Sequence, residues 1–243
     1  MLKRLRKAIA RTAAYRRLFP DREQFRAPIR DDAGRRAAWI DFLFVDFGIL
    51  RLFWKNRARI SPQAWRMNQP WPSDLAWAAR AGIRTVITAR HDPRHGGHAL
   101  EREACERLGL AYEVFPLFSR EAPAREALLA APAVFERIEY PVLLHCKSGA
   151  DRAGFLAALF LIVVEKTPVH DARHQLSLRF LHFRASRTGI LDAVFDAYLA
   201  AHPDEKTPFL DWVAADYDPA TVTAGFKPWR IVDFVDRILL RRE

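Results

Sequence analysis

The sequence predicts an α/β fold with a central, mostly parallel sheet flanked by helices. From about residue 61, short β-branched and apolar runs alternate with stretches of helical periodicity, which is typical of parallel sheets covered by helices. Half of the 243 residues are hydrophobic and 12% are aromatic, so the chain can bury a sizeable core. Glycines and prolines stand between the runs, where they end helices and strands.

The expected elements follow one another in a regular order. Strands are expected at 65–68, 85–88, 112–115 and 142–144. Helices are expected at 73–81, 99–108, 123–138 and 153–164. The last of these helices is strongly apolar and should therefore lie at the centre of the core. Beyond it the chain turns helical, with further helices expected at 168–181, 188–200, 208–215 and 229–241.

The excess positive charge lies near the N-terminus. Residues 1–60 hold 16 Lys and Arg against 6 Asp and Glu, a net charge of +10, which equals that of the whole protein. Residues 2–19 predict a basic amphipathic helix that ends at Pro20. This segment either binds an anionic membrane surface or packs its apolar stripe against the domain. Nucleic acid is disfavoured as a partner, because Tyr15 alone offers a stacking ring among these charges.

One apolar stretch, 39–54 (WIDFLFVDFGILRLFW), is too short to cross a membrane. It contains Asp41, Asp46 and Arg51, and a span needs ~18 or more apolar residues with few charges. We interpret it as a buried or interfacial segment. The first residues lack the apolar core of a secretory signal. The expectation is a cytoplasmic protein, with peripheral attachment to the inner face of the membrane as a further prediction.

The cysteines and histidines do not predict a metal site. Cys105 and Cys146 have neither paired nor metal-type spacing, which suits a reducing compartment, and Cys105 is expected in the core. His91, His95 and His98 invite a metal interpretation. The neighbouring Gly-Gly and the lack of a supporting carboxylate cluster favour a flexible loop instead.

One motif dominates the sequence, the HCKSGADR loop at 145–152, which lies between a predicted strand and a predicted helix. Backbone N–H groups in such a loop form an anion-binding concavity, and the helix N-terminus adds positive potential. A thiol at Cys146 should ionise readily there and act as a nucleophile. Arg152 supplies a planar fork that matches two phosphate oxygens. The alternative is a structural cysteine at a strand end, which requires the histidine, glycine and arginine to coincide by accident.

The loop resembles the His-Cys-x5-Arg signature of protein tyrosine and dual-specificity phosphatases. The segment 65–70 (WRMNQP), followed by Leu75, 82–83 and 85–87, is similar to the opening strand–helix–strand of compact bacterial members. The resemblance covers roughly residues 60–200. It implies a tyrosine-phosphatase-like fold, a cysteinyl-phosphate intermediate, and neither metal nor cofactor.

The resemblance also implies a role for each residue of the loop. Cys146 would be the nucleophile, Arg152 the phosphate clamp, and His145 the residue that orients the loop and eases ionisation of the thiol. The residues implied to bind phosphate are Lys147, Ser148, Gly149, Ala150, Asp151 and Arg152. Lys147 also resembles a lysine found in phosphoinositide phosphatases, and its charge favours polyanionic head groups.

The chain departs from the family in two places. Ala153 stands where the family usually has Ser or Thr, whose hydroxyl helps the intermediate break down, so either turnover is slow or another group substitutes. The expected acid loop, 115–123, contains no Asp. Three carboxylates remain as candidates for the general acid: Asp151 first, as in myotubularin-like and Sac-like lipid phosphatases, then Asp92, then Glu121.

The predicted organisation is a basic extension at 1–60, a catalytic domain at 61–205 and a helical extension at 206–243. Arginines of the C-terminal part either bind further phosphate or form a solvated face; they are Arg173, Arg179, Arg184 and Arg187. The sequence predicts a phosphate monoester hydrolase of the protein tyrosine or dual-specificity type. Two alternatives stay open: a membrane-associated phosphatase of a phospholipid or inositol phosphate, and a non-catalytic phosphate-binding module.

Overall fold

A computed structural model of the chain describes residues 21–229. The predicted basic helix at 2–19 lies outside the described residues, and so does the helix predicted at 229–241 except for its first residue.

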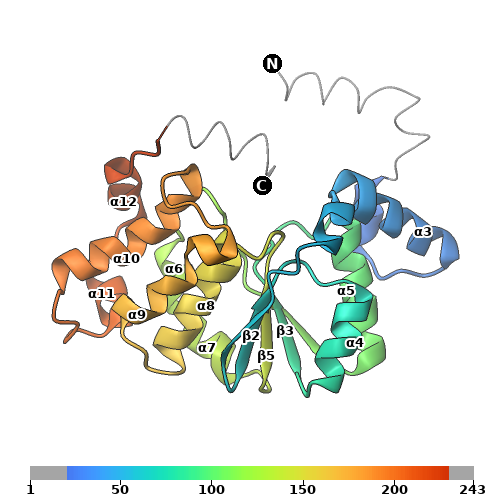
Figure 1. The fold of residues 1–243 in the computed structure, drawn as a ribbon, viewed down its shortest axis with the longest axis horizontal. Helices are drawn as coiled ribbons and strands as arrows, with labels where there is room; N and C mark the ends of the chain where they lie inside the picture. The colour runs from blue at the N-terminus through green and yellow to red at the C-terminus, as the bar shows by residue number, and fades with distance from the viewer. Residues whose placement is uncertain (1–20, 230–243) are drawn as a thin grey trace. The chain divides into compact units, whose positions relative to one another are not determined.

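The sheet has five strands, and four of them run parallel (Figure 1). They are β1 (Ala58–Ser61), β2 (Ala64–Met67), β3 (Thr85–Thr88), β4 (Ala111–Val114) and β5 (Val142–His145). Their order is β1-β2-β5-β3-β4, and β1 pairs antiparallel with β2 at one edge. The predicted fold class is confirmed, and so are the four predicted strands. The edge strand β1 was not predicted, because its short sequence ARIS lacks the apolar pattern of a buried strand.

The described chain divides into two compact units. Unit 1 contains residues up to 54 together with 70–81 and 92–110, and unit 2 contains 55–69, 82–91 and 111 onward. All five strands belong to unit 2. The domain limits predicted at 60 and 205 remain a prediction.

The core of unit 2 forms around helix α8 (Asp151–Val163). This helix packs against β5 and β2, and nearly all of its residues are buried, as its apolar sequence predicts. The other helices of the unit are α6 (Arg125–Leu129), α7 (Ala131–Glu136), α9 (Val169–Ala172), α10 (Ile190–Ala201), α11 (Phe209–Ala215) and α12 (Pro219–Gly225).

Two of the helix predictions are wrong in part. The helix expected at 123–138 is interrupted at Ala130, because Pro132 cannot continue a helix and instead sits in the first turn of α7. The helix expected at 168–181 is one turn, α9, followed by short 3-10 turns. The α-helical pattern ends there because the Leu176 amide donates to the carbonyl of Arg173 at 2.9 Å, three residues back, and the Gln175 carbonyl accepts a hydrogen bond from Arg66.

Unit 1 contains α3 (Asp32–Ile40), α4 (Pro72–Arg80) and α5 (Gly96–Leu108), preceded by a 3-10 turn, Arg22–Arg26. A π-turn (Asp41–Val45) and a 3-10 turn (Gly48–Leu52) follow α3. Its small core consists of Phe25, Ala38, Phe42, Ala99 and Leu100. Within residues 21–229, no helix is both long enough and apolar enough to cross a membrane.

Candidate active site

The HCKSGADR loop leaves the carboxyl end of β5, the central strand of the sheet, and enters α8 at Asp151. Both parallel neighbours of β5 hold the start of the loop. The Ala89 amide, just after β3, donates to the carbonyl of His145 at 2.8 Å, and the Gln69 amide, just after β2, donates to the carbonyl of Lys147 at 3.1 Å. The carboxyl end of parallel strands is where α/β proteins bind ligands.

Side chains of unit 2 also hold the middle of the loop by its carbonyl groups. Arg66 Nη2 donates to the carbonyls of Gly149 at 2.6 Å and Ala150 at 3.1 Å, and Asn56 Nδ2 donates to that of Ser148 at 3.2 Å. In a planar trans peptide the N–H points opposite to the C=O. The amides that follow these carbonyls are therefore turned away from the holding side chains, as an anion cradle requires.

Gly149 is needed at the turn of this loop. Its φ is +76°, a conformation that L-residues rarely adopt. A Cβ atom there would lie 2.7 Å from the backbone nitrogen of Asn68 and 2.8 Å from the carbonyl carbon of Met67. The end of β2 thus passes directly against the loop, and a side chain at residue 149 would push the two apart.

Arg66 is the central support of the loop, and the sequence interpretation did not identify it. Its side chain is fully buried, lies 3.7 Å from the centroid of the Phe180 ring, and also donates to Gln175. Burial lowers the pKa of Arg66 to about 9, although the charges of Cys146 and Asp151 act in the opposite direction. The one available signal was an arginine in a strand otherwise predicted to be buried.

The two residues central to the prediction, Cys146 and Arg152, are both buried, with 1% and 3% of their surface exposed. Cys146 directly follows β5, and Arg152 lies in the first turn of α8. His145 is fully buried in β5, and its Nδ1 lies 3.3 Å from the carbonyl oxygen of Cys146. Ala153 is buried in the apolar core beside them, so no hydroxyl is present at that position.

Asp151, the first candidate for the general acid, belongs to a buried chain of charges. His182 Nδ1 lies 2.7 Å from Asp151 Oδ1, and His182 Nε2 lies 2.5 Å from Asp192 Oδ2. Burial acts to lower the pKa of His182, but the hydrogen bonds with Asp151 and Asp192 outweigh it and raise this pKa to about 9. At neutral pH His182 therefore carries a proton beside Asp151. His182 and Asp192 are far from the motif in sequence and were not predicted.

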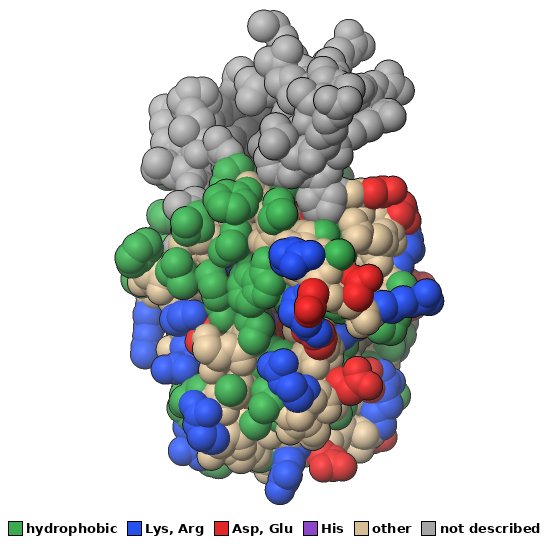
Figure 2. Space-filling view, turned by 90° about the vertical axis from the view of Figure 1, so that its right-hand side faces the viewer, with side chains coloured by type: hydrophobic (Ala, Val, Ile, Leu, Met, Phe, Trp, Pro, Cys, Tyr) green, Lys and Arg blue, Asp and Glu red, His purple; other side chains and the backbone are tan. Residues whose placement is uncertain are grey.

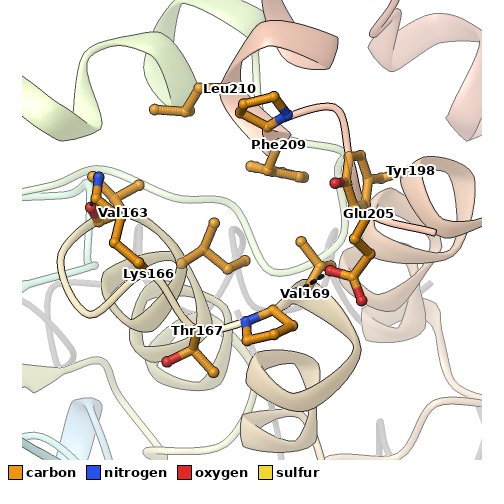
Figure 3. A pocket seen from close by; sticks show the side chains of 11 residues that line it. Val163, Lys166, Thr167, Val169, Tyr198, Glu205, Phe209 and Leu210 are labelled. Carbon is orange, nitrogen blue, oxygen red and sulfur yellow. Dashed lines mark hydrogen bonds between the residues drawn. The ribbon is translucent and has the colours of Figure 1, made fainter. Parts of the chain in front are cut away.

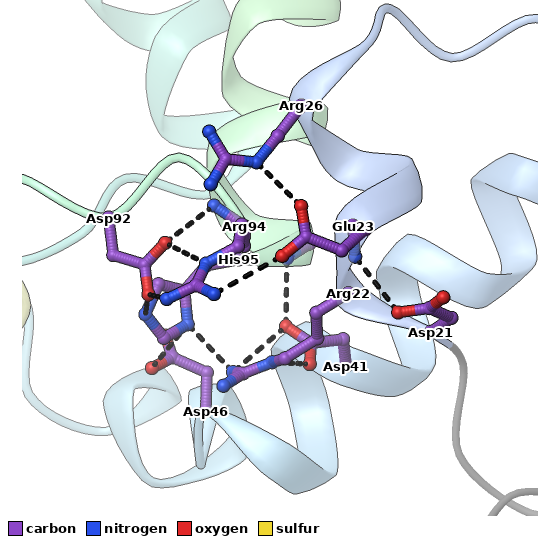
Figure 4. A network of polar contacts seen from close by, with 10 residues as sticks. Asp21, Arg22, Glu23, Arg26, Asp41, Asp46, Asp92, Arg94 and His95 are labelled. Carbon is purple, nitrogen blue, oxygen red and sulfur yellow. Dashed lines mark hydrogen bonds and ion pairs between the residues drawn. The ribbon is translucent and has the colours of Figure 1, made fainter.

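Asp92, the second candidate, belongs to unit 1 and is engaged there (Figure 4). Its carboxylate accepts hydrogen bonds from Arg94 Nε at 2.9 Å and Nη2 at 3.0 Å, and from the Arg94 amide at 3.0 Å. Burial acts to raise the pKa of Asp92, but these bonds outweigh it and lower the pKa. An ionised carboxylate cannot donate a proton, so this setting disfavours Asp92 as the acid.

Glu121, the third candidate, is exposed on the segment after β4. The histidines considered as metal ligands are divided between the units: His91 stacks near Phe118 in unit 2, with ring centroids 4.3 Å apart, while His95 and His98 lie in unit 1. Within residues 21–229 no group of three or more His, Cys, Asp or Glu side chains is placed to hold a metal ion.

Two cavities lie in unit 2. One, of about 460 Å³, is lined by His182 and Asp192 together with Arg173 and Arg184, and both arginines pair with Asp196. The other, of about 290 Å³, lies at the far end of α8 (Figure 3). There Val163, Lys166, Val169 and Phe209 line a largely apolar hollow. Thirteen residues of helix, ~20 Å at 1.5 Å per residue, separate it from the loop, so we assign the chemistry to the loop end.

Arg179 and Arg187, the remaining candidate phosphate ligands, are exposed on the chain between α9 and α10. Arg179 lies over the Phe180 ring at 5.4 Å. Neither of these two arginines lines the His182 cavity, whose two lining arginines, Arg173 and Arg184, both pair with Asp196.

The parallel sheet thus delivers His145 and Cys146 to a helix that begins with Asp151 and Arg152. Residues 59–160 match the family model of the phosphatase-like domain of β-lactamase hydrolase-like protein. This match spans β1 from its second residue, the four parallel strands and the HCKSGADR loop. Over these residues the chain is similar to that phosphatase-like domain.

The chain is 34% identical over 98 residues to β-lactamase hydrolase-like proteins from two strains of Xylella fastidiosa. The aligned part is 39% of this chain and 22% of the relatives, so the chain spans about a fifth of their length.

Solved structures with a similar fold include TpbA of P. aeruginosa, at 21% identity with a TM-score of 0.47, covering 70% of this chain and 89% of that one. Another is a putative phosphatase from Shewanella putrefaciens, at 20% identity with a TM-score of 0.49, covering 62% and 97%.

Proposed function

We propose that this protein is a phosphate monoester hydrolase of the protein tyrosine or dual-specificity phosphatase type. It would act through a cysteinyl-phosphate intermediate on Cys146. The observation that carries the proposal is the orientation of the loop. Donors from Arg66, Asn56 and Gln69 hold four successive carbonyls, which turns the intervening amides to the other side. The positive end of α8 begins at the same place, so an anion bound there is stabilised by both.

The reaction has two in-line steps. In the first, the sulfur of Cys146 bonds to phosphorus as the bond to the leaving oxygen breaks, and that oxygen takes a proton from a general acid. In the second, a water oxygen bonds to phosphorus, the S–P bond breaks, and the former acid accepts a proton from the water. Inorganic phosphate and the thiolate of Cys146 result. Arg152 stabilises the phosphoryl oxygens in both steps.

Asp151, supported by His182, is the general acid in this proposal. It lies within the loop, next to Arg152, and its hydrogen-bond partner carries a proton at neutral pH. A protonated His182 favours the ionised form of Asp151, so the acid is the pair: its transferable proton rests on His182 at neutral pH and reaches the leaving oxygen through Asp151. Glu121 remains an alternative on the acid-loop segment, and Asp92 is disfavoured by its pairing with Arg94.

Ala153 makes the second step the slow one, because no hydroxyl at that position assists the attacking water. Rapid mixing with p-nitrophenyl phosphate should then show a burst of one product per enzyme, followed by slower turnover. The Cys146→Ser variant should retain phosphate binding and show neither burst nor turnover. If this variant and the wild type release p-nitrophenol at equal rates, Cys146 is not a nucleophile, and the alternative of a non-catalytic phosphate-binding module is favoured.

The substrate class is tested separately. Phosphotyrosyl peptides and short-chain phospholipid or inositol phosphates should be compared by kcat/KM with the same preparation. The positive charge of Lys147 in the loop favours substrates with more than one negative group. A preference for the lipid-type substrates would replace the protein-phosphatase assignment while leaving the chemistry at Cys146 intact. Binding of an anionic membrane through residues 1–20 remains a prediction.

A further inference from the structure

The segment Ile40–Trp54 of unit 1 is folded with its charges inward and its apolar side chains outward. It begins at the end of α3 and continues through the π-turn and the 3-10 turn, which pack against each other. All of its charged residues are buried: Asp41 and Asp46 at 0% exposure and Arg51 at 8%. This is the reverse of an ordinary surface segment.

The buried charges are fully engaged with one another and with unit 1. Asp41 accepts from Arg22 Nε at 2.6 Å and from the Gly96 amide at 2.8 Å (Figure 4). Arg51 donates to the Asp46 carboxylate at 2.8 Å and to its carbonyl at 2.9 Å. The charges that keep this sequence from being a membrane span are therefore withdrawn from its outer face.

The outer face is apolar and partly aromatic. Where the side chains are described, each exposed residue of the segment is apolar: Ile40, Phe44, Ile49, Leu52, Phe53 and Trp54. Phe53 is 90% exposed. Hydrophobic side chains gather broadly on the face of the molecule drawn in Figure 2. Exposed apolar clusters of this kind mark binding surfaces, because leaving them in water is unfavourable.

We propose that Ile40–Trp54 docks the protein onto the interface of an anionic lipid bilayer. Trp and Phe are favoured at the level of the lipid head groups, and an amphipathic surface buries its apolar face there. The surrounding described chain is also net positive, since residues 21–60 hold nine Lys and Arg against six Asp and Glu. Exposed Arg30 and Arg36 precede the segment, and Arg57 follows it. Each basic residue near an anionic surface strengthens its attachment.

The bilayer explains this combination better than a protein partner does. Phe53, the most exposed side chain of the segment, is adjacent in sequence to the exposed Trp54, and such an aromatic pair suits insertion between lipid head groups. The proposal rests on described residues alone and does not depend on the predicted helix at 2–19. It is also independent of the chemistry at Cys146.

The test is co-sedimentation of the full chain with two kinds of vesicle. One kind is phosphatidylcholine alone, and the other contains about 30% of the anionic lipid phosphatidylglycerol. The wild type should bind the anionic vesicles. The double variant Phe53→Ser, Trp54→Ser should lose about tenfold or more in partition coefficient, because two aromatic side chains no longer enter the interface. Leu129→Ser is the matched control, since Leu129 is exposed to a similar degree as Leu52 but lies on α6.

Light scattering without vesicles completes the experiment. A wild type that does not bind anionic vesicles, or a double variant that binds as well as the wild type, overturns the proposal. A dimer that the double variant converts to a monomer, without vesicle binding by either, assigns the surface to a second copy of the chain and also overturns it. Turnover of a soluble aryl phosphate should be the same in both proteins, so a failure here is distinct from a failure of the phosphatase assignment.

Discussion

At the scale of single residues, the loop depends on Gly149 both for its positive φ and for the close approach of β2. Substitutions can separate these two requirements. Gly149→Ala should lower the free energy of unfolding by on the order of 2 kcal/mol and reduce phosphatase activity, because a Cβ meets backbone atoms at 2.7 and 2.8 Å in a left-handed conformation. Urea denaturation and turnover of p-nitrophenyl phosphate measure the two effects.

Gly82→Ala is the matched control for this substitution. Gly82 also has a positive φ, of 84°, but a Cβ there meets nothing within 4 Å. Gly82→Ala should lower the free energy of unfolding by about 1 kcal/mol, because of the left-handed conformation alone, and leave activity unchanged. Equal effects of the two variants on stability and activity would show that the close approach of β2 to the loop is unimportant.

The assignment of Asp151 as the acid predicts a dependence on the leaving group. Asp151→Asn should reduce kcat/KM by about a hundredfold or more for an alkyl phosphate, whose leaving oxygen needs a proton. It should have little effect for p-nitrophenyl phosphate, which leaves as an anion. The ratio of kcat/KM for the alkyl phosphate to kcat/KM for p-nitrophenyl phosphate should therefore fall, and His182→Asn should lower the same ratio. If neither variant changes the ratio, Glu121 becomes the favoured candidate.

The residues that could be predicted from sequence are those in a local motif. Cys146, Arg152 and the glycine between them stand within seven positions, so their spacing alone indicated an anion loop. Arg66 lies 83 positions from Gly149, and His182 lies 31 positions from Asp151. Their roles arise only when the sheet and the C-terminal turns come together, and an isolated arginine or histidine carries no such information.

At the scale of secondary-structure elements, His182 links the start of α8 to the start of α10 through Asp151 and Asp192. The pKa of His182 in the folded protein, about 9, lies above the value of 6.5 expected when unfolded. The stabilisation is thus fully present below about pH 6.5 and is lost as pH rises through about 9. The free energy of unfolding should fall over this range by up to roughly 3 kcal/mol.

Chemical denaturation between pH 6 and pH 10 measures this loss. His182→Gln removes the titrating group, so its unfolding free energy should change less over the same range. The prediction fails if wild type and variant show parallel profiles.

The elements were predictable where local rules decide them and not where distant groups do. Gly109, with φ of +67°, ends α5 as expected, and the apolar runs at β3 and β5 are buried strands. The chain at 168–181 has a helical sequence pattern. It is α-helical for one turn only, and the 3-10 turn that follows places the Gln175 carbonyl against Arg66, a contact between distant positions that no local pattern shows.

At the scale of the whole molecule, the two units interleave along the chain. The sequence passes between them five times, at 54, 69, 81, 91 and 110. The described part of unit 1 therefore comes from three separate segments of the chain. The predicted boundary at residue 60, drawn from charge, could not reveal this, because net charge carries no information about chain crossings.

Such interleaving predicts one cooperative unfolding transition. Differential scanning calorimetry should give a single peak whose calorimetric and van't Hoff enthalpies agree. Phe42→Ala, in the small core of unit 1, should shift this peak to lower temperature without splitting it. Two resolved peaks in the variant would mean that the units unfold independently.

The support of the loop by Arg66 has a further consequence for the thermodynamics of binding. Hydrogen bonds from the protein's own side chains fix the carbonyls at 148–150. The loop backbone therefore loses little conformational entropy when an anion binds, and most of the electrostatic attraction contributes to affinity. Calorimetric titration of the Cys146→Ser variant with inorganic phosphate would therefore show only a small entropic penalty.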